Sequence, residues 1–599
     1  MLWGVVCNAE GKTLYLNTGG ASLWETDGAN KFAIWHWQGS QSGAWSSWMT
    51  RVDGNVWKAD VSDSSDKVIF CRFNNMASSP NWNSDMWNQT EDLMPGSNNL
   101  FTITGWGNGK SQGNWSAYGQ GGGDNPGGGT DPVNPGGGTD PVTPGDYATA
   151  VPSQCEDVIL QAFYWKSNVN SGYGDTKWES LQNQVSEIGN YFTMVWLPPS
   201  AQASGISAGG LGYIPLIYST QSCLMGKRAA LDGLISSLHS KGVRVLADIV
   251  INHIGNGDGK CGDLKTQNFG TYGTFSPTKD WLTSNDEGGC GSSGNQDDGQ
   301  HDANFSAARD WDHKNSNVQN MCKAYLKWMK NEVQYDGWRY DMVGGYHVSH
   351  INEYNTASKP YFSVMEYWIG DANELKTRID EAGKNTFAFD FAAKYNVFRD
   401  GIYSKNYSKC VNGGLRGKGY SKYAVTFIDN HDTFNRGSDG EDVANKRDGS
   451  SINDGSLMRR CHAYLLSMPG VPCVFYPHWV QYKSDIQKLI TARRKAGIHS
   501  ESSVQEEAGN GYYRATIQGK YGSVKLMLGS AANDAAPAGY TQAVKGSDYA
   551  VYYTGNGPQG IESTPVETSR KNGEKFLKDG QLYIRFGENV YDVRGNKIN

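Results

Sequence analysis

Apolar runs typical of β-strands alternate with amphipathic segments typical of α-helices in the part of the chain that begins at about Tyr147. The apolar runs lie at residues 158–163, 194–198, 243–251, 337–343, 361–366 and 425–429. Amphipathic segments such as 229–240 and 318–333 lie between several of these runs. Because the runs are almost continuously apolar, the pattern indicates a parallel sheet covered by helices, either a barrel or a doubly wound sheet.

Polar residues gather where these apolar runs end. They are Asp248, Asn252, His253, Asp341, Glu366, His431 and Asp432. In a (β/α)8 barrel the active site lies at the C-terminal ends of the strands. We therefore expect these side chains to meet at one rim.

One of the runs carries two opposite charges. After the turn signal at Asp336-Gly337, large residues alternate with Arg339 and Asp341. Side chains two residues apart point to the same side of a strand, so the guanidinium lies beside the carboxylate and favours its ionised form. An ionised carboxylate is what a nucleophile requires, while a buried structural ion pair is the alternative for this motif taken alone.

The N-terminal part of the chain shows a different pattern. Residues 1–119 contain short alternating runs, such as 31–37 and 67–73, with turn signals between them, which predict a β-sandwich. Eleven of the 20 Trp lie there. We expect about half of them to fill the core and the others to be free to stack on sugar rings.

A segment rich in Gly, Pro, Thr and Asp follows at residues 120–146, with 127–133 repeated at 136–142. Such a composition is typical of a linker. Beyond residue 500, alternating runs at 511–517, 523–528 and 549–553 predict an antiparallel β-domain over 500–560. The tail at 561–599 is predicted to form a β-hairpin. It resembles C-terminal sorting regions of bacterial secreted proteins, and one more module hairpin is the alternative.

Composition excludes several classes of function. The chain has 599 residues, a formal net charge of −7 with dispersed charges, and no run of 18 apolar residues. This gives no electrostatic footprint for nucleic acid and no segment able to span a bilayer. The N-terminus lacks the regions of a secretory signal, although a signal removed earlier would leave no trace in this sequence.

The ten Cys are too sparse for a disulfide framework. We expect one bridge between Cys261 and Cys290, which flank a Gly-, Asp- and Ser-rich stretch, and buried thiols at Cys322, Cys461 and Cys473. The absence of Cys-x-x-Cys spacing argues against a zinc site made of thiolates.

Four segments, in this order, resemble the conserved blocks of the α-amylase family, glycoside hydrolase family 13. They are DIVINH at 248–253, GWRYDMV at 337–343, VMEYW at 364–368 and FIDNHD at 427–432. The Gly212-Tyr213 pair and residues 469–475 add to the likeness. The resemblance implies a (β/α)8 TIM barrel over 147–499, with a loop subdomain after the third strand at about 254–304.

The resemblance also implies catalytic roles. Retaining cleavage of a glycosidic bond needs a carboxylate nucleophile and a carboxylic acid on opposite sides of the anomeric carbon. By the likeness Asp341 is the nucleophile, Glu366 the general acid/base and Asp432 the acid that stabilises the distorted sugar. Apolar neighbours would raise the pKa of Glu366 enough for it to donate a proton. Substrate-binding positions are implied at Arg339, His253, His431 and Tyr213.

A calcium site is implied by the same likeness. Asn252, Asp310 and the carbonyl of Gly345 match calcium-binding positions of the family, and Asp302 is a further candidate from the long loop. Oxygen ligands from separate segments suit Ca²⁺.

The N-terminal unit resembles the starch-binding modules of carbohydrate-binding module family 26 at residues 14–17, 32–37, 68–70 and 87–93. By that likeness the stacking aromatics lie around Tyr15, Trp24, Trp35 and Trp37, of which Trp35 and Trp37 are the main candidates.

Together these resemblances imply a secreted or cell-surface bacterial α-amylase. It would act as a calcium-dependent monomer on starch, amylose, amylopectin and maltooligosaccharides. A maltooligosaccharide-forming or transglycosylating member of the family is one alternative. A non-catalytic starch-binding protein is another, disfavoured because Asp341, Glu366 and Asp432 are all present.

Overall fold

The chain folds into two compact units, Met1–Thr130 and Asp131–Asn599, and their boundary falls inside the Gly- and Pro-rich segment. The computed structural model describes residues 11–18, 24, 31–39, 41–53, 55–62, 64–82, 85–95, 99–107, 110–116, 145–169, 172–203, 211–255, 262–284, 290–296, 298–300, 308–436, 442–443, 454–557, 574–578, 581–586 and 589–592. Among these residues no helix is both long and apolar enough to cross a membrane.

The N-terminal unit is the predicted β-sandwich. One sheet has the order β4-β5-β1-β8-β9 and the other β3-β2-β6-β7. The strands are β1 (Gly11–Asn17), β2 (Lys31–Trp37), β3 (Ala44–Trp45), β4 (Thr50–Asp53), β5 (Val56–Ser62), β6 (Lys67–Phe73), β7 (Met86–Gln89), β8 (Leu100–Gly107) and β9 (Lys110–Ser116). Leu14 and Leu16 of the first sheet pack with Phe32 and Ile34 of the second, so the two inner faces share one core.

Eight parallel strands form a closed barrel in the second unit, which confirms the barrel and excludes the doubly wound sheet. In order around the ring they are β10 (Ile159–Gln161), β11 (Met194–Trp196), β14 (Arg244–Ile249), β19 (Gly337–Tyr340), β20 (Phe362–Met365), β21 (Phe387–Phe389), β22 (Ala424–Phe427) and β25 (Val471–Phe475). The ring closes where β25 pairs with β10, with Cys473 beside Ile159. The strands read from the hydrophobic pattern did not include β21, which is only three residues long, or β25.

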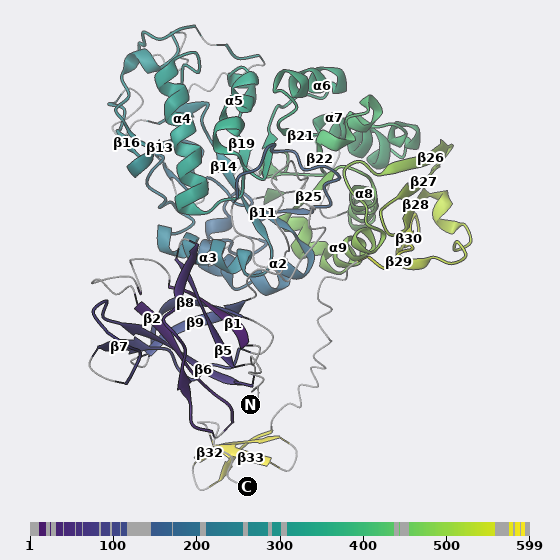
Figure 1. Cartoon of the computed structure of the whole chain (residues 1–599). Coiled ribbons are helices and arrows are strands. Elements are labelled where there is room, and N and C mark those ends of the chain that lie inside the picture. Colours follow the sequence, from purple (N-terminus) through teal and green to yellow (C-terminus); the bar gives the residue numbers. More distant parts are fainter. Residues whose placement is uncertain are drawn as a thin grey trace, which may run out of the picture. The chain divides into compact units, whose positions relative to one another are not determined.

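Helices cover the outside of the barrel (Figure 1). The α-helices are α1 (Trp178–Gln182), α2 (Val185–Tyr191), α3 (Arg228–His239), α4 (Ser316–Trp328), α5 (Ser349–Ser358), α6 (Ala372–Glu381), α7 (Phe391–Ala393), α8 (Gly455–Ser467) and α9 (Tyr476–Ala496). The π-helices η5 (Met329–Val333) and η7 (Lys394–Tyr403) extend α4 and α7. Helix α9 has Pro477 in its first turn and ends at Gly497, whose φ of 71° gives the left-handed C-terminal cap that glycine favours.

The segment between β14 and β19 contains the long loop that the sequence predicted at about 254–304. Its short strands are β15 (His253–Ile254), β16 (Gln267–Asn268), β17 (Thr274–Phe275) and β18 (Arg309–Asp310), and β15 pairs with β18 at the base of the loop. Cys290 is disulfide-bonded. Its predicted partner Cys261 lies outside the described residues. Cys322, Cys461 and Cys473 are buried free thiols, as expected.

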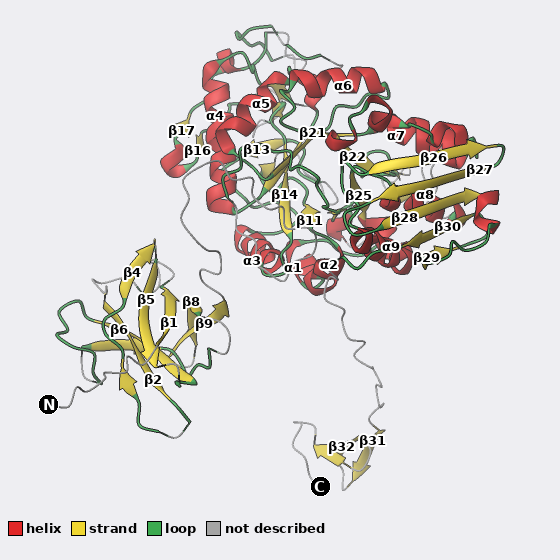
Figure 2. Ribbon diagram, turned by 45° about the vertical axis from the view of Figure 1, so that its right-hand side comes forward, coloured by secondary structure: helices red, strands yellow, loops and turns green. Residues whose placement is uncertain are grey.

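A five-stranded antiparallel sheet follows the barrel, in the order β26-β27-β28-β30-β29 (Figure 2). Its strands are β26 (Ser503–Gly509), β27 (Tyr512–Gln518), β28 (Ser523–Gly529), β29 (Thr541–Lys545) and β30 (Tyr549–Tyr553), and the sheet packs on α8 and α9. In the tail, the predicted hairpin is present as β32 (Gln581–Phe586) paired with β33 (Asn589–Asp592), and β31 (Glu574–Lys578) adds a third strand along β32.

Candidate active site

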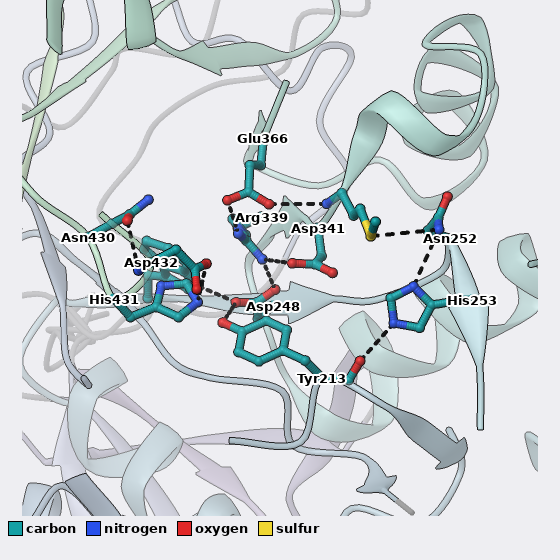
Figure 3. Close-up of polar contacts among 12 residues, drawn as sticks. Tyr213, Asp248, Asn252, His253, Arg339, Asp341, Glu366, Asn430, His431 and Asp432 are labelled. Atoms are coloured by element: carbon teal, nitrogen blue, oxygen red, sulfur yellow. Dashed lines mark hydrogen bonds and ion pairs between the residues drawn. The ribbon is translucent and has the colours of Figure 1, made fainter. Parts of the chain in front are cut away.

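The predicted polar residues meet at one rim of the barrel because each follows the C-terminal end of a parallel strand. Asp248 lies near the end of β14, Arg339 lies on β19, and Asp341 follows β19 directly. Glu366 follows β20, and Asp432 lies in the loop after β22. Figure 3 shows these side chains together around one centre.

The Arg339 guanidinium is the centre of this group, and it is completely buried. One of its terminal nitrogens, Nη1, donates to Asp248 Oδ1 at 2.7 Å and to Asp341. Its other terminal nitrogen, Nη2, forms an ion pair with Glu366 Oε1 at 2.6 Å. A single cation therefore touches three carboxyl groups that come from three neighbouring strands.

This shared contact changes the electrostatics expected from the sequence, which paired one arginine with one aspartate. Burial raises the pKa of Asp341, and the neighbouring carboxylates of Glu366 and Asp248 raise it further, although the Arg339 charge opposes them. Burial likewise raises the pKa of Asp248 to about 6 against the opposing charge of Arg339. One guanidinium cannot compensate three buried negative charges, so the group retains a proton near neutral pH.

Asp248 was predicted to lie at the rim, but no role was assigned to it from the sequence. Its carboxylate accepts hydrogen bonds from Tyr213 at 2.7 Å and from Trp196 Nε1 at 3.1 Å, besides the one from Arg339. The pairing of β14 with β19 places it in register with Arg339. That register depends on which strands become neighbours, which the hydrophobic pattern does not reveal.

Glu366 receives a second contact from the backbone. The N–H of Met342 lies 3.2 Å from Glu366 Oε2. Met342 has a φ of 49°, a left-handed conformation that is strained for a residue with a side chain. The turn after Asp341 thus aims a backbone donor at the carboxyl group of the next strand.

Asp432 is held by aromatic residues rather than by Arg339. Its carboxylate accepts a hydrogen bond from Trp165 Nε1 at 3.2 Å and lies 3.1 Å from Nε2 of His431. The His431 ring stacks on Tyr213 with centroids 5.1 Å apart, and the Arg339 guanidinium lies over that same tyrosine ring at 5.8 Å. Tyr213 therefore connects Asp432 to the carboxyl groups around Arg339. Trp165 was not among the predicted site residues, although it lies just after the first apolar run at 158–163.

His253 is completely buried beside this group. Its Nε2 lies 2.8 Å from the backbone oxygen of Tyr213, and burial lowers its pKa to about 4. The imidazole is therefore neutral and fixes the backbone that carries the Tyr213 ring.

The loop that presents His431 and Asp432 is anchored from inside the barrel. The side-chain oxygen of Asn430 accepts hydrogen bonds from the backbone N–H groups of Asp432 and Thr433 at 3.0 and 2.8 Å. Below it, the buried ammonium of Lys394 donates to the Ile428 carbonyl at 2.7 Å and pairs with Asp429 at 3.0 Å. Lys394 begins the π-helix η7, a helix type that often marks functional sites.

The predicted metal ligands are placed in part. Asn252 and Asp310 are both buried, and the Asn252 amide donates to Asp310 Oδ1 at 3.1 Å. The other amide atom, Asn252 Oδ1, is buried without a hydrogen-bond partner. Gly345 is buried in the turn after Asp341, while Asp302 lies outside the described residues. Among the described residues no three His, Cys, Asp or Glu side chains form a metal-binding group.

The N-terminal aromatics divide into core and surface. Trp24 is completely buried and donates to Ser111 Oγ, so the expectation that it stacks on a ligand is wrong. Trp35 and Trp37 are half-buried on β2. Trp35 packs edge-on against Trp45 and Trp82, with centroids 5.1 and 5.5 Å apart, and Trp82 is 46% exposed. This cluster could not be identified from the sequence, because Trp45 and Trp82 come next to Trp35 only in the folded unit.

No protein-family model matches the chain. Among curated proteins, a probable α-amylase 2 of Arabidopsis thaliana is 32% identical over 425 residues, which cover 66% of this chain and 94% of that protein. The chloroplastic α-amylase 3 of the same plant is 30% identical over 423 residues, but the match spans only 44% of its length. A glucan 1,4-α-maltotetraohydrolase of Stutzerimonas stutzeri is 27% identical over 441 residues, covering 68% of this chain and 75% of that protein.

The anchor beneath the rim can be tested through stability. Replacing Lys394 with Met leaves Asp429 buried without its cation, and we expect the free energy of unfolding to fall by about 3–5 kcal/mol. The double change Lys394→Met/Asp429→Asn should recover part of this loss. Urea unfolding followed by tryptophan fluorescence measures both.

The control is Lys359→Met, since Lys359 forms an ion pair with Asp146 in which both side chains are more than half exposed. We expect it to change stability by less than about 1 kcal/mol. A Lys394→Met variant as stable as this control would contradict the anchoring role.

Proposed function

Because the chain belongs to the α-amylase family, glycoside hydrolase family 13, we propose that it hydrolyses α-1,4-glucosidic bonds within starch and related glucans with retention of configuration. The observation that carries the proposal is the contact of Asp341 and Glu366 with one guanidinium at the barrel rim. Two carboxyl groups held around one centre can serve both steps of a retaining reaction, one as nucleophile and the other as acid and then base.

In the first step Asp341 attacks the anomeric carbon of the sugar while Glu366 donates its proton to the departing glycosidic oxygen. The bond to the leaving chain breaks, and an ester forms between Asp341 and the sugar. In the second step Glu366 takes a proton from water, and the resulting hydroxide breaks the ester and restores Asp341. Asp432 binds the sugar hydroxyl groups and favours the distorted ring of the transition state.

Arg339 prepares both carboxyl groups for these roles. Its charge favours an ionised oxygen on Asp341, while the crowding of three carboxyl groups around one cation keeps one proton in the group. The Met342 N–H holds one oxygen of Glu366 in place.

The shared contact of the two carboxyl groups with Arg339 favours retention. Asp341 and Glu366 contact different terminal nitrogens of one guanidinium. This favours the short separation of retaining enzymes, about 5–5.5 Å, over the roughly 6.5–9.5 Å that leaves room for water in inverting enzymes.

One alternative within the family has a specific basis. A relative that is 27% identical is named for releasing maltotetraose. The same three acids serve such an enzyme, because product length depends on the loops that hold the chain rather than on the reacting groups. A single dominant product in early samples favours this alternative, and a mixture of chain lengths favours the endo-acting α-amylase.

A structural calcium ion fits the residues beside the rim. Asn252 Oδ1 is a buried oxygen without a protein partner, and the Asp310 carboxylate lies against the same amide. Two buried oxygen donors from the two sides of the β15–β18 pair suit Ca²⁺, with the Gly345 carbonyl and Asp302 as further ligands. When bound, the ion would link the long loop to the barrel.

We assign the N-terminal unit to binding of α-glucans through Trp35 and Trp37, joined to the barrel by the Gly- and Pro-rich segment. Tethering a binding unit to a hydrolase raises the effective concentration of an insoluble polymer at the catalytic unit. We further propose that the protein is secreted or attached to the cell surface and acts as a monomer.

The assignment of nucleophile and acid predicts opposite responses to an activated substrate. Glu366→Ala should lower hydrolysis of starch by about 10²–10⁴-fold, yet retain the first step on a dinitrophenyl α-maltoside, whose leaving group needs no proton. Added azide should then accelerate turnover of this variant by attacking the ester between Asp341 and the sugar, and the product should be the α-maltosyl azide. Asp341→Ala should lose both substrates and, with azide, give the inverted product.

Glu353→Gln on α5 is the control and should leave both rates unchanged. Equal loss of the activated substrate in the Glu366→Ala and Asp341→Ala variants would contradict the assignment.

The calcium proposal predicts a metal-dependent melting temperature. Wild-type protein should melt several degrees higher in calcium chloride than in EGTA, because an ion that binds only the folded state stabilises it. Asn252→Ala should remove most of that difference, as measured by scanning calorimetry. Identical wild-type melting temperatures in both buffers would exclude the site.

The module proposal predicts that Trp35→Ala weakens adsorption of the full chain to starch granules, while its rate on a short soluble maltooligosaccharide stays unchanged. Trp87→Ala is the matched control, since Trp87 is 40% exposed on β7, whereas its neighbour Met86 is the residue of that strand that packs against the same buried cluster as Trp35. Equal adsorption of the two variants would show that Trp35 is not part of the glucan-binding surface.

A further inference from the structure

An open groove lies on the flank of the barrel, away from the rim. It is an open depression of about 340 Å³, formed where α9 meets β29 and β30 and the end of α2. The residues that matter for its chemistry are Tyr191, Gln487, Lys488, Thr491, Gln542 and Tyr553.

The groove faces away from the rim. Helix α9 begins directly after the C-terminal end of β25 and runs back along the barrel, so its later residues lie toward the opposite end of the strands. Tyr191 ends α2 just before β11 begins, at that same end. A ligand in the groove therefore does not touch the reacting groups around Arg339.

The polar groups in the groove are available to a ligand. Within the described part of the chain, the side-chain amides of Gln487 and Gln542 and the hydroxyl groups of Tyr191 and Tyr553 have no hydrogen-bond partner in the protein. Gln542 is exposed, and both tyrosines are half-buried and line the groove.

The chemistry of the lining selects one class of ligand. It contains no carboxylate, which excludes a cation site, and its single cation, Lys488, is too little for a phosphate chain or nucleic acid. The polar lining does not suit an apolar peptide. Amides that bind neighbouring hydroxyl groups and phenol rings that pack on flat C–H faces suit a neutral, polyhydroxylated ligand.

We propose that this groove is a second α-glucan site, which holds part of the same polymer that is cleaved at the rim. The inference rests on the proposed function, because the polymer is identified by that reaction. Holding the chain at a second point raises its effective concentration at the rim without changing the reacting groups. Long glucans are therefore cleaved more efficiently, whereas substrates too short to reach both the groove and the rim gain nothing from the groove.

The direct test is hydrogen exchange measured by mass spectrometry on the full chain, with maltoheptaose as the probe and Glu366→Gln to prevent its cleavage. We expect maltoheptaose to protect the segment 541–553. Protection there should be lost in the triple variant that adds Gln487→Ala and Gln542→Ala, and retained when Gln505→Ala is added instead. Gln505 is exposed on β26, the opposite edge of the same sheet.

Kinetics on the active enzyme gives a second readout. In the Gln487→Ala/Gln542→Ala variant, kcat/KM for amylose should fall severalfold and kcat/KM for a short aryl maltoside should stay unchanged. The groove proposal alone is overturned if the enzyme degrades starch but maltoheptaose does not protect 541–553. It is also overturned if the double variant and the wild type have equal kcat/KM for amylose. A wild-type enzyme without activity on starch overturns the proposed function instead.

Discussion

The buried guanidinium of Arg339 is the constraint on which the rest of the site depends. A charge without access to water is tolerated only where opposite charges surround it, and here three carboxyl groups from three strands do so. Removing Arg339 would leave these groups to repel one another in a region of low dielectric constant. The same interaction that stabilises the rim also opposes the rise in pKa that burial causes at Asp341 and Asp248.

The barrel makes this arrangement feasible because it is closed and parallel. Each strand ends at the same rim, so a residue just beyond a strand end needs no long loop to reach its neighbours. A second layer then refines the positions: Met342 turns its N–H toward Glu366, His253 fixes Tyr213, and Asn430 organises the loop that carries Asp432. The geometry of the rim follows from backbone positions that the core already determines.

Much of the fold and of the candidate site could be predicted from the sequence, because the patterns that indicate them are local in the chain. Apolar runs with polar ends predicted the strands and the rim, and the order of the four segments identified the family. The sharing of Arg339 with Asp248 could not be predicted, since it depends on the register between β14 and β19. Trp165 and the Trp35–Trp45–Trp82 cluster were missed for the same reason, because their contacts join distant parts of the chain. Trp24 was misjudged because the likeness to a family of binding modules does not tell a core tryptophan from a surface one.

The central claim is that Asp341 and Glu366 act on opposite sides of one sugar carbon, held by a single arginine. The configuration of the newly formed reducing end tests it most directly, since two displacements restore the starting configuration and one displacement inverts it. Proton NMR of the first product formed from maltoheptaose, recorded before the anomers equilibrate, should show the α-anomer. Initial release of the β-anomer would contradict this account.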